Sequence, residues 1–219
     1  MRTIFYIDGF NFYYGLKNKK RIDSTWAKYY WIDIVKLCEQ FLGPDDTLIK
    51  VKYFTAPPLS LGKRIRQSAL FKANDIINKD KFELIRGKYI MKPMMCNNCK
   101  QQFEKPEEKR TDVNISVQLL GDCALNKVDK VVLISADSDL VPPLEFIKEN
   151  FPAKKIKIYF PPTSYSNDLR DISFRRKIVK LENNRNNFEL AIMPTEVVKS
   201  DGSDTAIIPA SWIYDDNSR

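Results

Sequence analysis

The 219-residue sequence contains no histidine. This absence excludes histidine-based catalytic triads, histidine general bases and Cys₂His₂ zinc sites formed within one chain. Glycine-rich phosphate loops are also absent. The sequence has only seven glycines, and they form neither the G-x-G-x-x-G dinucleotide pattern nor a Walker lysine motif. A nucleotide-dependent switch or a dehydrogenase is therefore disfavoured.

Long apolar runs and a disulfide framework are missing as well. No run approaches the roughly 20 apolar residues of a transmembrane helix. The first apolar stretch is short and meets Asp8 too early for a signal peptide. The four cysteines, Cys38, Cys96, Cys99 and Cys123, lack the spacing of a secreted disulfide scaffold. We therefore expect a cytoplasmic protein that does not act in a membrane.

Positive charge is in excess. The chain has 36 Lys and Arg against 28 Asp and Glu, which gives a net charge of +8. A basic chain favours a polyanionic partner such as nucleic acid, although an inert basic surface is the alternative. Hydrophobic residues make up 43% of the sequence, which is enough for one sizeable α/β core.

Acidic residues follow two predicted strands. The apolar run 131–134 predicts a strand buried on both faces, and Asp137 and Asp139 come just after it. The run 3–7 predicts a second strand, which leads directly into Asp8. Strand and helix patterns alternate about five times, which predicts a central, mainly parallel sheet of about five strands between two helix layers. Because such strands place their carboxyl ends at one edge, we expect these aspartates to converge.

Two further polar residues stand at predicted helix starts. Asp112 falls in the first turn of a helix expected to reach about Asn126, and Asn11 follows the first strand. Each also has a purely structural explanation, since an acid gains up to about 1 kcal/mol from the helix dipole and Asn is a good cap. Several carboxylates together require a cation, and their hard oxygens favour Mg²⁺ or Mn²⁺. The predicted catalytic residues are Asp8, Asn11, Asp112, Asp137 and Asp139, with the four aspartates as metal ligands.

A polar, charged segment from Lys92 to Glu108 interrupts this pattern and contains Cys96 and Cys99. A Cys-x-x-Cys pair is half of a zinc site. Three interpretations stay open: a simple turn, a Zn²⁺ site completed by acidic residues or by a second subunit, and a redox pair. The strand-to-helix context of a thioredoxin motif is absent.

Two basic clusters are candidate nucleic-acid contacts. Lys63, Arg64 and Arg66 lie near the start of a helix predicted over residues 61–79, where positive charge opposes the helix dipole. Phosphate binding would explain that placement, and a solvated helix face is the alternative. The second cluster is Arg175, Arg176 and Lys177.

Three motifs resemble one known family. They are Tyr6-Ile7-Asp8-Gly9-Phe10-Asn11, the segment 107–115 around Asp112, and Ile134-Ser135-Ala136-Asp137-Ser138-Asp139-Leu140. In this order they resemble the NYN domain of the PIN-like nuclease superfamily, which includes LabA-like proteins. The resemblance spans about residues 2–180. It implies a PIN-like, Rossmann-like three-layer α/β/α fold and an acidic Mg²⁺- or Mn²⁺-dependent ribonuclease site formed by the aspartates and Asn11 named above. Ala136 stands where the family more often has glycine.

We expect an NYN/PIN-like domain over residues 1–182, with the Cys-x-x-Cys insertion at about 91–108 and a C-terminal extension over 183–219. The leading hypothesis is a metal-dependent endoribonuclease that acts on single-stranded or structured RNA. The alternative is a catalytically weak or inactive RNA-binding or regulatory module. A phosphatase is less favoured, because the first strand lacks a following Asp-x-Asp pair. A homo-oligomer is compatible with the sequence.

Overall fold

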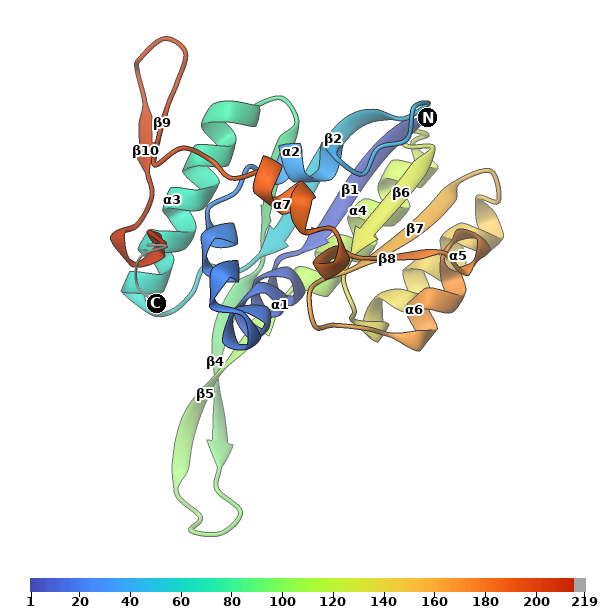
Figure 1. Cartoon of the computed structure of the whole chain (residues 1–219). Coiled ribbons are helices and arrows are strands. Elements are labelled where there is room, and N and C mark those ends of the chain that lie inside the picture. The colour runs from blue at the N-terminus through green and yellow to red at the C-terminus, as the bar shows by residue number, and fades with distance from the viewer. Residues whose placement is uncertain (215–219) are drawn as a thin grey trace.

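The computed structural model describes residues 1–214 and is built around one parallel sheet (Figure 1). Its six strands lie in the order β3-β2-β1-β6-β7-β8, and every neighbouring pair is parallel. The strands are β1 (Arg2–Asp8), β2 (Thr47–Thr55), β3 (Phe82–Arg86), β6 (Lys130–Ile134), β7 (Lys155–Phe160) and β8 (Ile178–Lys180). The predicted α/β fold is confirmed, and β8 is the strand beyond the expected five.

The strand order reverses at β1. From β1 the chain moves outward through β2 to β3, returns to pair β6 with the other side of β1, and continues to β7 and β8. In open parallel sheets, ligands bind outside the carboxyl ends of the strands at such a switch point. Here that position lies between the carboxyl ends of β1 and β6, where Asp8 ends β1 and where Asp137 and Asp139 come just after β6.

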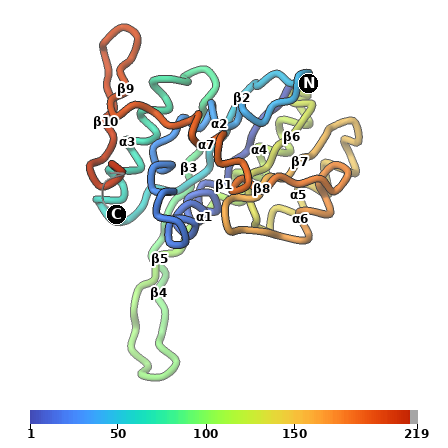
Figure 2. The backbone as a smooth tube through the Cα atoms, in the orientation of Figure 1, coloured from blue at the N-terminus to red at the C-terminus, as the bar shows by residue number. Residues whose placement is uncertain are grey.

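Two layers of helices cover the sheet (Figure 2). Along β1, Phe5 and Ile7 face one apolar core, whereas Ile4 and Tyr6 face the other, as the two-residue strand period requires. The first core contains apolar side chains of α1 (Gly9–Ile22), α2 (Ile34–Glu39), α3 (Leu61–Asn78) and α7 (Arg185–Leu190). The second contains those of α4 (Thr111–Ala124), α5 (Val141–Asn150) and α6 (Asn167–Ile172).

A buried ion pair fixes α4 against the sheet. The Nζ atom of Lys52 on β2 lies 2.6 Å from Asp122 Oδ2 on α4, and these side chains are only 8% and 5% exposed. Tyr6 on β1 donates its hydroxyl proton to the same carboxylate oxygen over 2.7 Å. Lys52 also donates to Gln118 Oε1 over 2.6 Å. Because α4 is bonded to two strands in this way, its first turn has a defined place relative to their carboxyl ends.

The apolar strand pattern over residues 82–90 belongs to two strands, because β3 ends at Arg86 and the next strand of the chain begins at Lys88. The chain leaves the sheet at Gly87, whose N–H donates to Thr55 O over 2.9 Å. A Cβ atom at Gly87 would lie 2.7 Å from both Glu108 Oε1 and Thr111 Oγ1. Only glycine permits this close crossing of the two ends of the inserted segment. Sequence periodicity could not reveal it, because the crowding comes from residues 20 or more positions away.

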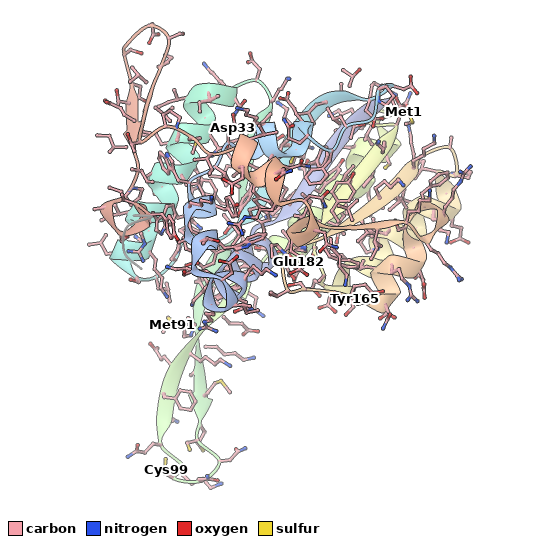
Figure 3. The ribbon with its side chains drawn as sticks, viewed as in Figure 1. Met1, Asp33, Met91, Cys99, Tyr165 and Glu182 are labelled. Atoms are coloured by element: carbon pink, nitrogen blue, oxygen red, sulfur yellow. The ribbon has the colours of Figure 1, made fainter. Side chains whose placement is uncertain are left out.

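The insertion is an antiparallel hairpin of β4 (Lys88–Met95) and β5 (Gln102–Lys109), which projects from the domain (Figure 1). Cys99 lies at its tip, far from Met91 nearer the base (Figure 3). The expected insertion at 91–108 is thus a two-stranded arm. None of the helices within residues 1–214 has the length and apolar character that crossing a membrane requires.

The described part of the C-terminal extension packs on the domain. Phe188 of α7 is buried beside Trp26 and Tyr29 in the first core. The indole N–H of Trp31 donates to Pro194 O over 2.7 Å. The strands β9 (Glu196–Val198) and β10 (Thr205–Ile207) form a second hairpin, which contacts α3. The boundary predicted after residue 182 stays a prediction.

Candidate active site

Asp8 is the most tightly held residue of the predicted site. It ends β1, is 2% exposed and caps α1. Its Oδ1 accepts from the backbone N–H groups of Phe10 and Asn11, both over 3.1 Å, and its Oδ2 accepts from Asn11 Nδ2 over 2.6 Å. Burial raises the pKa of Asp8, whereas these hydrogen bonds to the charged form act in the opposite direction. Asn11 is therefore a positioning partner of Asp8 as well as a residue of the first turn.

The close turn after Asp8 depends on Gly9. A Cβ atom there would lie 2.4 Å from Tyr53 Cε1 and 2.5 Å from the carbonyl oxygen of Phe54. The chain therefore passes against β2 where only glycine fits, and α1 can begin directly at the end of the strand.

Ser135 joins the ends of the two central strands. It is fully buried, and its Oγ donates to Asp8 Oδ2 over 2.8 Å and accepts from the N–H of Asp137 over 3.0 Å. Asp137 in turn accepts from the N–H of Asp139 over 3.0 Å, where it caps a short 3₁₀ helix (Ser138–Leu140). Ser135 is not among the site residues predicted from the sequence. The sequence signal for it is its position, since it is a small polar residue between the buried strand 131–134 and Asp137.

Asp112 approaches this edge from the start of α4. Burial is the largest cause that raises the pKa of Asp112 to about 6, and the charges of Asp137, Asp8, Glu108 and Asp139 raise it further. The structure therefore brings the predicted aspartates within electrostatic reach of one another. Their roles as metal ligands stay a prediction.

Glu108 is a fifth carboxylate near this edge that the sequence reasoning missed. It lies near the end of β5 and accepts from the backbone N–H of Thr111 over 3.2 Å and from the hydroxyl of the same residue. Arg110 between them has a φ of 81°, in the left-handed region. Glu108 thus closes the turn that leads into α4, so the hairpin is coupled to the position of Asp112.

The donor chemistry of the site fits a hard divalent cation. Carboxylate oxygens are the ligands that Mg²⁺ and Mn²⁺ prefer, and a cation would relieve the repulsion that raises the pKa of Asp112. Within residues 1–214, no three His, Cys, Asp or Glu side chains are arranged closely enough to hold one ion. Both oxygens of Asp8 are already hydrogen-bonded. The match between this site and a divalent cation therefore rests on its carboxylate oxygens and on the negative charge of the cluster.

The Cys-x-x-Cys pair lies in the turn of the β4–β5 hairpin, on a different part of the molecule. The N–H of Lys100, whose φ is 58°, donates to Cys96 O over 2.9 Å and closes the turn. Backbone hydrogen bonds from Cys99 and Asn98 lower the pKa of the Cys96 thiol. All four cysteines are free, and Cys38 and Cys123 are buried. Zinc at Cys96 and Cys99 stays a prediction.

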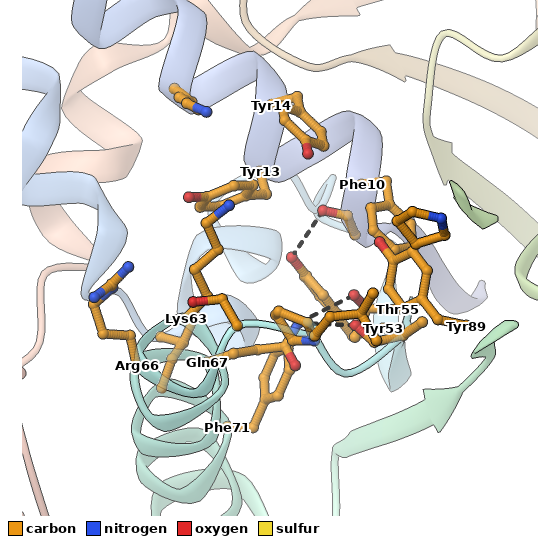
Figure 4. Close-up of a pocket in the computed structure, with 18 of the residues that line it drawn as sticks. Phe10, Tyr13, Tyr14, Tyr53, Thr55, Lys63, Arg66, Gln67, Phe71 and Tyr89 are labelled. Atoms are coloured by element: carbon orange, nitrogen blue, oxygen red, sulfur yellow. Dashed lines mark hydrogen bonds between the residues drawn. The ribbon is translucent and has the colours of Figure 1, made fainter. Parts of the chain in front are cut away.

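Two of the three basic residues predicted on α3 line one cavity, and their role in nucleic-acid binding stays a prediction. Lys63 and Arg66 line a cavity of about 360 Å³ beside the turn that follows Asp8, together with Gly9 and Phe10 (Figure 4). We call it the aromatic cavity. Arg64 does not line it, and its Nε donates to Pro58 O over 3.2 Å instead. Their spacing explains the difference, since residues three apart share a helix face and adjacent residues do not.

The second predicted basic cluster lies elsewhere. Arg175, Arg176 and Lys177 immediately precede β8. Arg175 and Arg176 line a hollow together with Lys154 and Ile156, at the amino end of β7. The predicted site aspartates follow the opposite, carboxyl ends of the strands. The structure therefore does not bring this cluster to the acidic site, and its role in RNA binding stays a prediction.

The fold and the site define the class of this protein, which is a doubly wound parallel α/β domain with aspartates at its switch point. The NYN domain family model matches residues 2–173, so the chain belongs to the NYN-domain family, whose fold is PIN-like and whose superfamily is of the nuclease type. A crystal structure of a protein of unknown function from Vibrio parahaemolyticus has a similar fold. Its TM-score is 0.53 and its identity 18%, over 81% of this chain and 91% of that chain.

One curated relative is named as a monooxygenase and not as a nuclease. The 6-hydroxy-3-succinoylpyridine 3-monooxygenase HspA of Pseudomonas putida is 28% identical over 181 residues. The match covers 68% of this chain and 56% of the relative, so this chain spans little more than half of that protein's length.

Proposed function

We propose that this protein is a metal-dependent endoribonuclease that hydrolyses phosphodiester bonds of RNA. The observation that supports this best is the gathering of the predicted aspartates from β1, β6 and α4, whose charges contribute to raising the pKa of Asp112 to about 6. Membership of a nuclease-type superfamily whose members generally act on RNA supports the substrate class. The net charge of +8 favours a polyanion.

In this proposal Asp8, Asp112 and Asp137 hold Mg²⁺ or Mn²⁺, and Asp139 orients a water molecule or contributes to a second ion. A bound ion of this kind polarises the phosphodiester and makes water a stronger nucleophile at neutral pH. Asn11 and Ser135 keep Asp8 in place through the hydrogen bonds described above. Because the chain has no histidine, we assign the role of proton acceptor to one of these carboxylates.

The test is cleavage of labelled single-stranded and hairpin RNA with Mn²⁺, Mg²⁺ or EDTA. Wild type is compared with Asp8→Asn and Asp137→Asn, and with Asp75→Asn, which removes an exposed acid on α3. Cleavage that requires metal, is lost in the two site variants and persists in Asp75→Asn would support the proposal. Cleavage that survives both site variants would refute the assigned site.

The second candidate function is an RNA-binding module without cleavage. The observation that favours it is that residues 1–214 present no preformed group of three ligands for a metal ion. In that case wild type would bind RNA but leave it intact with every divalent ion, and Asp8→Asn and Asp137→Asn would bind RNA as wild type does.

A further inference from the structure

The aromatic cavity is assembled from distant parts of the chain. Its walls come from α1, the end of β2, the start of α3, the base of the β4–β5 hairpin and Trp212 near the C-terminus. It adjoins the acidic edge, because Gly9 and Phe10 line it and directly follow Asp8. Its volume of about 360 Å³ lies in the range of small-molecule sites, which is about 300–1,000 Å³.

Aromatic rings form much of its surface. Tyr13 and Tyr14 project from α1 on one side, and Phe71 lies on α3 on the other (Figure 4). Phe10 and Tyr89 meet edge to face, with ring centroids 6.2 Å apart, where α1 approaches the hairpin. Tyr14 is 50% exposed, and Lys17 Nζ lies over its ring, 5.5 Å from the ring centroid.

The charged side chains that line the cavity are all basic: Lys17, Lys63 and Arg66. None of the three forms an ion pair within residues 1–214. Burial raises the pKa of Tyr13, and the charge of Arg66, which lines the same cavity, opposes that change. The described part of the cavity therefore combines aromatic walls with basic side chains.

A second hollow continues this charge away from the cavity. It shares Tyr13, Lys17, Arg66 and Trp212 with the aromatic cavity and adds Lys20 and Arg21. Cations arranged in succession along a surface match the spaced phosphates of a nucleic-acid strand better than a single small anion. The hollow thus indicates where a chain attached to the ligand would leave the cavity.

We propose that the aromatic cavity binds an aromatic ring that carries an anion, and that its source is one nucleotide of single-stranded RNA. The base stacks among Tyr13, Tyr14 and Tyr89, and its phosphate lies near Lys63 and Arg66. Stacking on aromatic side chains is tolerant of sequence, because every base has a π-face. This site therefore selects unpaired nucleotides but does not distinguish one base from another. Only the RNA source rests on the proposed function, because binding does not require cleavage.

The experiment measures binding to the full chain by calorimetry in EDTA, which removes cleavage from the result. The probes are AMP, adenosine without the anion, ribose 5-phosphate without the ring, benzoate and a six-nucleotide single-stranded RNA. AMP is expected to bind saturably at one site. Adenosine, which lacks the phosphate, and ribose 5-phosphate, which lacks the aromatic ring, should each bind at least about tenfold more weakly than AMP. The RNA should compete with AMP and bind more tightly.

Variants connect the binding to this cavity. Arg66→Gln and Tyr14→Ala should each weaken AMP binding about tenfold, whereas Tyr14→Phe keeps the ring and should bind as wild type. Lys79→Gln removes an exposed charge at the far end of α3 and serves as the matched control. Benzoate that binds more tightly than AMP would overturn the RNA source in favour of a small aromatic acid. Absence of saturable binding by every probe, or binding unchanged in Arg66→Gln and Tyr14→Ala, would overturn the proposal.

Because these measurements use EDTA, their outcome is separate from that of the nuclease assay. A protein that binds AMP and RNA in the cavity but cleaves nothing would refute the endoribonuclease proposal and retain the binding site. A protein that cleaves RNA but fails the binding tests would refute the binding site and retain the endoribonuclease proposal.

Discussion

The buried pair of Lys52 and Asp122 should be far more important for stability than its single 2.6 Å contact suggests. Lys52→Met would leave a carboxylate that is only 5% exposed without its counter-ion, and Asp122→Leu would leave the ammonium group unpaired. Removal of one partner of a buried pair costs about 3–5 kcal/mol of unfolding free energy. Each single variant should therefore approach the limit of stability for an ordinary domain, which is about 5–15 kcal/mol.

The double variant should recover most of this loss. When both charges are replaced by apolar groups, the desolvation penalty disappears, and such replacements are often neutral or stabilising by about 1–4 kcal/mol. The hydroxyl of Tyr6 would then lack its acceptor at 2.7 Å, which costs about 1–3 kcal/mol. The double variant should thus lie within about 2 kcal/mol of wild type, and the coupling energy should be at least about 4 kcal/mol.

The assay is urea unfolding of wild type, both single variants and the double variant. With a slope of about 2 kcal/mol per molar urea, each single variant should shift the midpoint down by about 1.5–2.5 M. The matched control is the surface pair of Lys81 and Glu39, with a similar distance of 2.7 Å but side chains 48% and 37% exposed. Its loss should cost less than about 1 kcal/mol. If Lys52→Met costs no more than Lys81→Met, the reasoning from burial is refuted.

Three further predictions concern the site, the pH dependence and the hairpin. Ser135→Ala removes the two hydrogen bonds that link the carboxylate of Asp8 to the backbone N–H of Asp137. It should lower the rate of RNA cleavage about 10–100-fold while circular dichroism stays unchanged, and an unchanged rate would exclude a positioning role. Hydrogen bonds from Arg2 hold the pKa of Asp129 well below its usual range, so the stability this carboxylate contributes is fully present above about pH 4 and is lost progressively as pH falls below that value. The difference between the urea midpoints of wild type and Asp129→Asn should therefore shrink as pH is lowered below about 4, and a constant difference would contradict this. Cys96 and Cys99 lie in the turn of the β4–β5 hairpin, outside the domain's cores. Cys96→Ser/Cys99→Ser should therefore leave the urea midpoint of the domain unchanged, and a fall in wild-type stability on addition of a zinc chelator would show instead that metal supports the fold.

The two central strands and the acidic residues at their carboxyl ends could be predicted from the sequence by itself. The apolar run 131–134 and the run 3–7 each form a buried strand because nearly every residue in them is apolar, and such a pattern is local. The aspartates directly after them had to lie at the carboxyl edge, since parallel strands related by right-handed crossovers share one direction. The acidic edge, the parallel α/β class and the helix that carries Asp112 follow from these short-range patterns.

Contacts between distant segments were decided only by the tertiary structure. Ser135 bridges Asp8 and Asp137 because β1 and β6 are neighbours, although 127 positions separate Ser135 from Asp8. Gly87 ends a strand because the other end of the hairpin crosses it. Lys63 and Arg66 line a cavity whose remaining walls come from four other parts of the chain. Local sequence sets which residues a segment presents, but packing of remote segments sets what each residue meets, and no periodicity records that.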